Sequence, residues 1–306
     1  MIIDQQSTMT YRLLGKSDLN ISRIGFGCMS LKPGQPDLQA LVDKAVDLGI
    51  NFFDTADLYD KGLNESNVGK ALKGKRNEVI IATKVGNQLR ADGTGWDWNP
   101  HKEYILQAVE KSLQRLQTDR IDLYQLHGGT IDDPIDETIE AFELLQQQGK
   151  IRHYGISSIR PNVIREYIQR SNIISVMMQY SLLDRRPEEE CLALLKENNI
   201  GVLARGSIAG GLLAGKPAKT YLAYAEEDVL QAAKAIEQAT GKQSSTAATA
   251  IRYVLQHPAI TSAIVGIRTT EHLLEALQAV HDGALSTERM QSLNQSIRAE
   301  YYTQHR

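Results

Sequence analysis

The chain carries three short apolar runs in one stretch, INFF (50–53), VIIAT (79–83) and IDLYQL (121–126), and an amphipathic helical pattern follows each run. In those patterns apolar residues recur at three and four positions, as expected for a helix with one buried face. Strands that are apolar along their length are typical of a parallel sheet covered on both faces. This stretch therefore predicts consecutive β/α units.

The same alternation continues on both sides of this stretch. Five further apolar runs lie at residues 23–27, 151–156, 174–178, 200–204 and 262–266. Eight β/α units predict a closed parallel (β/α)8 barrel of the TIM type rather than an open sheet. Barrels of about this length fold as one unit, and no linker interrupts the chain, so we expect a single domain over residues 1–306.

Additions to the barrel are expected at both ends of the chain. Residues 11–22 (YRLLGKSDLNIS) predict a β-hairpin that caps the amino-terminal end of the barrel. Residues 286–301 predict an extra C-terminal helix. Residues 86–99 and 206–243, which are rich in Gly with Trp or Ala, predict long loops on the opposite face.

Composition narrows the function classes. A net charge of −3 in 306 residues provides no basic field for nucleic acid or an anionic membrane. Cys28 and Cys191 are too few for a disulfide framework, and no apolar stretch approaches a membrane span of about 20 residues. The histidines lack metal-ligand spacing, so no metal is expected. These features predict a cytoplasmic protein; they make no prediction about its oligomeric state.

Ionisable residues stand where three successive predicted strands end. Asp54 closes NFFD, Lys84 closes VIIATK and His127 closes DLYQLH, while Tyr59 lies five residues after Asp54. The carboxyl ends of barrel strands meet at one mouth, which is where such barrels place their active sites. The sequence therefore predicts that these four side chains share one site.

The four residue types fit the reduction of a carbonyl group. Tyr59 could donate a proton to the developing alkoxide, provided that a positive charge lowers its pKa from about 10. Lys84 could supply that charge, held in place by Asp54, and His127 could orient the carbonyl oxygen. A Schiff base on Lys84, as in a barrel lyase or aldolase, is an alternative, although Asp54 and Tyr59 favour the first interpretation.

The chain resembles the aldo-keto reductases over essentially its whole length. The resemblance rests on FDTADLY, IIATK and DLYQLHG, which contain Asp54, Tyr59, Lys84 and His127 in the family's order and spacing. It implies an NADPH-dependent reductase of small aldehydes or ketones. Some barrels of this kind are instead cofactor-sensing subunits that turn over slowly, and this alternative stays open.

The resemblance also implies a set of cofactor contacts. Ser157 and Gln179 match positions that hold the nicotinamide carboxamide, Arg268 matches a position that binds the 2′-phosphate, and Glu275 lies near the adenine. The remaining predicted contacts are Ser207, Leu212 and Lys216 around the pyrophosphate, and His272 near the adenosine.

The chain departs from the family pattern at three positions. Ser158 replaces a frequent Asn, Ala276 replaces an Asn near the adenine, and Arg205 replaces an aromatic residue that stacks on the nicotinamide. A guanidinium can also stack on a planar ring, so Arg205 is retained as a cofactor contact. In the family, the loop after the third barrel strand forms part of the substrate pocket. We therefore expect Trp96 and Trp98, which lie in this loop, to contact the substrate.

Overall fold

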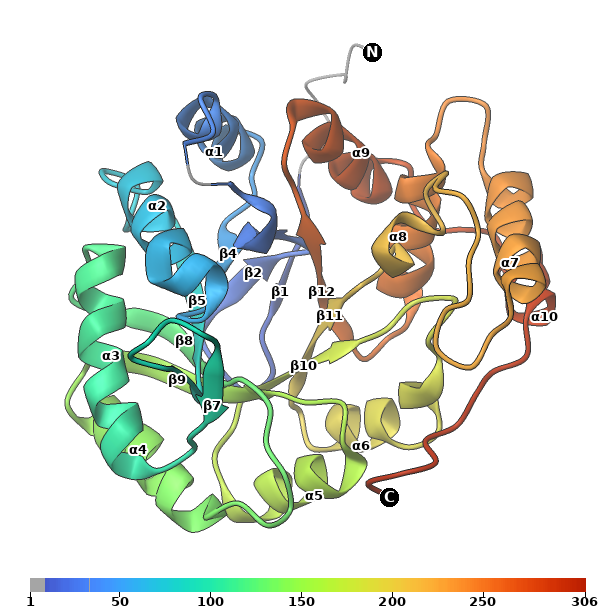
Figure 1. Ribbon diagram of the computed structural model, residues 1–306. Coiled ribbons are helices and arrows are strands. Elements are labelled where there is room, and N and C mark those ends of the chain that lie inside the picture. Colours follow the sequence, from blue (N-terminus) through green and yellow to red (C-terminus); the bar gives the residue numbers. More distant parts are fainter. Residues whose placement is uncertain (1–8, 33) are drawn as a thin grey trace.

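The computed structural model describes residues 9–32 and 34–306, which form a closed barrel of parallel strands surrounded by helices (Figure 1). Within these residues the eight barrel strands, in order of pairing, are β3 (Ile24–Gly27), β4 (Phe52–Asp54), β5 (Ile80–Val85), β8 (Ile121–Leu126), β9 (Ile151–Ser157), β10 (Ser175–Gln179), β11 (Gly201–Arg205) and β12 (Ile260–Gly266). Strand β12 closes the barrel by pairing Val265 with Phe26 of β3. The predicted (β/α)8 barrel is confirmed.

Helices follow the barrel strands and cover the outside of the barrel (Figure 1). In the described chain they are α1 (Leu38–Asp47), α2 (Leu63–Ala71), α3 (Lys102–Leu116), α4 (Ile135–Gln147), α5 (Pro161–Arg170), α6 (Cys191–Glu197), α7 (Glu226–Ala239), α8 (Thr246–Gln256) and α9 (Thr270–His281). None of the helices in the described chain is both long enough and apolar enough to span a bilayer.

One predicted loop is partly wrong. Residues 206–243 were expected to be a loop, but helix α7 occupies 226–239 and buries Val229, Ala232 and Ile236. Their spacing of three and four residues is helical, and alanine is the strongest helix former. The glycines that suggested a loop are confined to 206–215 and 241, outside the helix.

The predicted amino-terminal hairpin is confirmed. Strands β1 (Tyr11–Leu13) and β2 (Asn20–Ser22) pair in antiparallel fashion. Leu14 and Leu19 pack into one buried cluster with residues of the barrel interior, among them Phe52 and Leu203. Gly15 has φ +58°, and a Cβ there would lie 2.3 Å from the carbonyl oxygen of Ile174, so the turn requires glycine. The hairpin therefore closes the end of the barrel opposite the predicted site.

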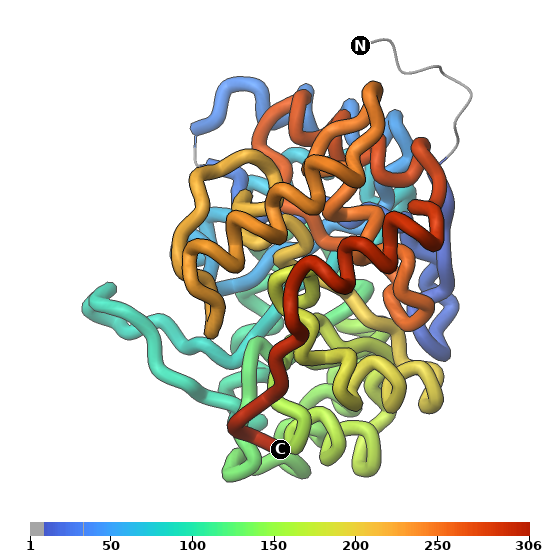
Figure 2. The backbone as a smooth tube through the Cα atoms, turned by 90° about the vertical axis from the view of Figure 1, so that its right-hand side faces the viewer, coloured from blue at the N-terminus to red at the C-terminus, as the bar shows by residue number. Residues whose placement is uncertain are grey.

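Two segments add to the rim at the other end. Residues 86–99 contain a second hairpin, β6 (Asn87–Leu89) and β7 (Trp96–Trp98), which projects from the barrel in Figure 2. The predicted C-terminal helix is α10 (Thr287–Ser296), which ends earlier than expected. The remaining tail runs from α10 toward α5, where the amide of Asn162 donates to the carbonyl of His305 at 2.9 Å (Figure 2).

Candidate active site

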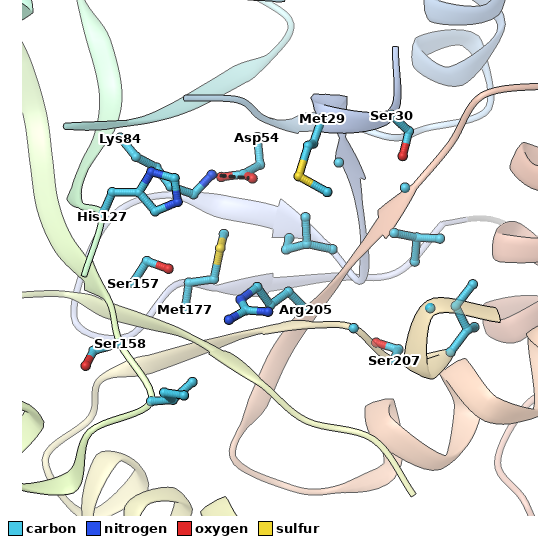
Figure 3. A pocket seen from close by; sticks show the side chains of 18 of the residues that line it. Met29, Ser30, Asp54, Lys84, His127, Ser157, Ser158, Met177, Arg205 and Ser207 are labelled. Carbon is cyan, nitrogen blue, oxygen red and sulfur yellow. Dashed lines mark hydrogen bonds and ion pairs between the residues drawn. The ribbon is translucent and has the colours of Figure 1, made fainter. Parts of the chain in front are cut away.

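A cleft of about 1090 Å³ lies at the carboxyl ends of the barrel strands. Asp54 ends β4, Lys84 lies near the end of β5 and His127 follows β8, and all three line this cleft together with Tyr59 (Figure 3 shows the first three). The structure thus brings together the four residues that the sequence pattern placed at one mouth.

Lys84 and Asp54 point toward each other across two neighbouring strands (Figure 3). The Lys84 Nζ donates to Asp54 Oδ2 and to the carbonyl oxygen of Thr55, both at 2.7 Å. Burial alone would lower the pKa of Lys84, but the attraction of Asp54 and Tyr59 outweighs burial and raises it. Lys84 is therefore a charged ammonium group, which is a poor nucleophile for a Schiff base.

Tyr59 lies directly above this ion pair. Its hydroxyl is 3.3 Å from Lys84 Nζ, and the ammonium is 5.0 Å from the centre of its ring. Burial raises the pKa of Tyr59, and the opposing attraction of Lys84 does not cancel this effect. The expectation of a lowered pKa is therefore wrong in its net direction, although Lys84 acts in the expected sense. Tyr59 carries its proton at neutral pH.

His127 completes the group on the side of β8. Its ring meets the Tyr59 ring edge to face, with centroids 5.9 Å apart. Burial, together with the positive charges of Lys84 and Arg205, lowers the pKa of His127 to about 3. The imidazole is thus neutral at physiological pH and can donate one hydrogen bond without carrying a charge.

The loop that carries Tyr59 is fixed by unusual backbone geometry. Asp60, Lys61 and Gly62 have φ values of 48°, 55° and 88°, so three successive residues adopt left-handed conformations. For the two residues with a Cβ this conformation costs energy and persists only where the surroundings impose it. Nearby, Thr55 Oγ1 donates to Asn64 Oδ1 at 2.7 Å and ties the start of the loop to α2. These constraints set the position of Tyr59.

Most of the predicted cofactor residues line the same cleft: Ser157, Arg205, Ser207, Lys216, Arg268, His272 and Glu275. The Ser207 Oγ and His272 Nδ1 are buried and lack a hydrogen-bond partner among the described residues. A buried polar atom without a partner is costly, so these atoms are suited to a polar ligand. Lys216 and Arg268 add positive charge to the lining, which suits an anionic ligand. The residues present therefore fit a dinucleotide.

Two predicted contacts, Gln179 and Leu212, are not among the described residues that line the cleft. Gln179 accepts from Arg205 at 3.0 Å and donates to the hydroxyl of Tyr221 at 3.0 Å, so it orients the guanidinium. In Figure 3, Arg205 reaches into the cavity. Leu212 is buried.

The two tryptophans differ in position. Trp96 is 48% exposed on the projecting hairpin. The Trp98 ring packs on Gly86 and Gly128, where an added Cβ would lie 2.6 Å and 3.3 Å from it, and its Nε1 donates to Asp133 at 2.9 Å. Among the described residues, neither lines the cleft, although Trp98 abuts Gly128, which does. Their role in substrate binding stays a prediction.

Sequence reasoning missed the part of the rim that comes from the end of the chain. Residues 302–305 line the cleft, and Tyr302 is 5% exposed with the Arg186 guanidinium 5.0 Å from its ring centre. Arg160, just before α5, lines it as well. The tail has no periodic pattern, so nothing in the sequence indicated that it returns to the barrel mouth.

A closed (β/α)8 barrel with a buried ion pair, a tyrosine and a histidine at its carboxyl end is the arrangement of a barrel enzyme. No group of three or more His, Cys, Asp or Glu side chains suited to a metal ion occurs in the part of the chain that the structure describes. Residues 23–298 match the Aldo/keto reductase family, and the chain belongs to this family. It is accordingly an oxidoreductase of carbonyl compounds.

Individual relatives extend over nearly the whole chain. The uncharacterized oxidoreductase YqkF of Bacillus subtilis is 50% identical over 97% of this chain and 100% of its own length. The holo form of aldo-keto reductase AKR11C1 from Bacillus halodurans has a TM-score of 0.91 and 49% identity, covering 97% of this chain and 99% of that one. The glycerol dehydrogenase AKR11B4 from Gluconobacter oxydans has a TM-score of 0.83 and 27% identity, covering 94% of each chain.

Proposed function

We propose that the protein reduces aldehydes or ketones to alcohols with hydride from NADPH, and that Tyr59 donates the proton. The observation that carries this proposal is the contact of 3.3 Å between the Tyr59 hydroxyl and the Lys84 ammonium inside the cleft. Because burial raises the pKa of Tyr59, its phenol is protonated before the reaction and has a proton to donate. The adjacent ammonium then stabilises the phenolate that forms as the proton leaves.

The hydride that adds to the carbonyl carbon would come from NADPH held by the cleft residues. Tyr59 gives its hydroxyl proton to the carbonyl oxygen, so that one C=O becomes one CH–OH group. Neutral His127 donates a hydrogen bond to the same oxygen and orients it. Lys84 remains charged throughout because its Nζ also donates to Asp54 Oδ2 and to the carbonyl oxygen of Thr55, both at 2.7 Å.

The cofactor assignment divides the cleft into two parts. Ser157 and Arg205 lie at the catalytic end, and Gln179 acts there by holding Arg205. Lys216 and Arg268 lie where the phosphates are expected, and Arg268 is the basis for preferring NADPH to NADH. The other proposed contacts are Ser207, His272 and Glu275 through their side chains and Leu212 through its backbone.

The decisive experiment follows loss of NADPH absorbance with a panel of sugars, aromatic aldehydes, dicarbonyls and ketones. For an accepted substrate, Tyr59→Phe should lower kcat by about 100-fold or more because the proton donor is gone. Its Kd for NADPH should stay unchanged. Tyr11→Phe, at the opposite end of the barrel, is the matched control and should behave as wild type. Binding of NADPH without turnover of any carbonyl, or near-normal kcat in Tyr59→Phe, would contradict the proposal.

A further inference from the structure

The cleft has an excess of positive charge. Among the described residues that line it there are two carboxylates, Asp54 and Glu275. The cationic side chains of the lining are more numerous: Lys84, Arg160, Arg186, Arg205, Lys216 and Arg268. A cleft lined mainly by one sign of charge attracts ligands of the opposite sign.

Most of these cations have a partner or a role already. Lys84 is paired with Asp54, and Arg186 is paired with Asp184 at 2.8 Å. Lys216 and Arg268 belong to the proposed phosphate end. Arg205 is held by the neutral Gln179 and lies beside the proposed nicotinamide position.

Arg160 differs from the other cations of the cleft, because it has neither a carboxylate partner nor a proposed cofactor contact. It is half-buried and stands between β9 and α5, and its guanidinium donates to the carbonyl oxygen of Gly129. Gly129 is two residues beyond His127, a span of at most about 7.6 Å of chain. Arg160 and His127 therefore flank one part of the cleft, on the side where Ser158 and Ile159 form the wall.

No carboxylate in the described chain lies within 4.0 Å of the Arg160 guanidinium. The neighbouring acid, Asp133, is already engaged: it accepts from the backbone amide and hydroxyl of Thr130, at 2.7 Å and 2.9 Å, and from Trp98. A guanidinium has five N–H donors, and the Gly129 carbonyl occupies one nitrogen of the group. The remaining donors match the two oxygens of a carboxylate.

We propose that Arg160 binds a carboxylate on the substrate, so that the preferred substrates are aldehydes or ketones that also carry a carboxylate. The inference rests on the proposed carbonyl reduction and names its substrate class. The carbonyl lies at Tyr59 and His127, and the carboxylate lies toward Arg160. Leu58 and Ile159 line the cleft with apolar surface, which suits a short hydrocarbon chain or one aromatic ring between the two groups.

The test compares two substrates that differ only in this charge, 4-carboxybenzaldehyde and methyl 4-formylbenzoate. In the wild type, kcat/KM for the acid should exceed that for the ester by about tenfold or more, the value of one charge-assisted hydrogen bond. Arg160→Gln should remove this preference by raising KM for the acid, with kcat/KM for the ester unchanged. Arg165→Gln is the matched control, since Arg165 lies on α5, the helix that Arg160 precedes, but pairs with Glu190.

Equal kcat/KM for acid and ester in the wild type, or equal losses in Arg160→Gln, would overturn this inference and leave carbonyl reduction standing. Failure of both aldehydes to oxidise NADPH would count against the proposed reduction itself. In that case calorimetry tests the inference without turnover. It compares the Kd of the NADP⁺-saturated protein for 4-(hydroxymethyl)benzoate with its Kd for the methyl ester. Tighter binding of the acid that is lost in Arg160→Gln supports it, and equal binding overturns it.

Discussion

Lys84 and Asp54 form an ion pair of 2.7 Å in the candidate active-site cleft, and their side chains are 1% and 6% exposed. Burying such a pair has a desolvation cost. Removing either partner lowers stability strongly, because the remaining charge is then buried without a partner. The position of the pair beneath Tyr59 makes it part of the site as well as of the core.

Lys84→Met should therefore lower both activity and stability. Removal of the ammonium leaves Asp54 as an uncompensated buried acid, and we expect the free energy of unfolding to fall by about 3–5 kcal/mol. Chemical denaturation measures this change. The double variant Asp54→Asn/Lys84→Met should recover part of the loss in stability but none of the activity. Lys150→Met, which breaks a surface pair with Glu110, should change stability by less than about 1 kcal/mol. A single Lys84→Met variant as stable as wild type would contradict the argument.

Asp57, two residues before Tyr59, should make stability depend on alkaline pH. Burial, together with repulsion by Glu65, raises its pKa from 3.8 to about 8. The folded protein thus holds the Asp57 proton more tightly than the unfolded chain does. Protonated Asp57 therefore contributes fully to stability below pH 3.8, and this contribution is lost as pH rises through about 8. Asp57→Asn keeps the neutral form. It should equal wild type near pH 4 and exceed it by about 2–4 kcal/mol near pH 9. Chemical denaturation at both pH values measures this difference. If wild type and Asp57→Asn differ in free energy of unfolding by the same amount at pH 4 and at pH 9, the prediction is wrong.

Arg268 should decide between the two nicotinamide cofactors. Its exposed guanidinium lies at the proposed adenosine end of the cleft, where the 2′-phosphate of NADPH is the distinguishing group. Arg268→Ala should raise KM for NADPH by about tenfold, since a charge-assisted contact is lost, and leave KM for NADH unchanged. Steady-state kinetics with both cofactors measures the ratio. Equal effects on the two cofactors would remove the phosphate-binding role.

Trp98 and Trp96 should behave differently when replaced by alanine. Trp98 packs on Gly86 and Gly128, so Trp98→Ala leaves a cavity beside the His127 loop and should cost about 2–4 kcal/mol of stability. The same loss of support should raise KM for the carbonyl. Trp96→Ala, on the exposed hairpin, should change stability by less than about 0.5 kcal/mol. Thermal unfolding and KM for an accepted substrate check both. If KM is unchanged in both variants, neither tryptophan contributes to the substrate site.

The barrel could be predicted because its signal is local and repeated. Each strand is an apolar run and each helix is a pattern of apolar residues at three and four positions, so a run such as VIIAT (79–83) and the helical pattern that follows it are recognisable in isolation. Helix α7 was missed because its alanines were grouped with the glycines that precede it. The end of α10 was expected at residue 301, but the helix ends at Ser296 because the backbone of Ile297 is extended.

The sequence by itself determined that Asp54, Lys84 and His127 lie at or next to the carboxyl ends of neighbouring strands, because chain order fixes strand order in a barrel and the strand ends meet at one rim. Only the tertiary structure decided the net pKa shift of Tyr59, since burial depends on every segment around the mouth. It alone also placed Arg160 beside the His127 loop and residues 302–305 at the rim, because contacts between distant segments leave no local pattern in the chain.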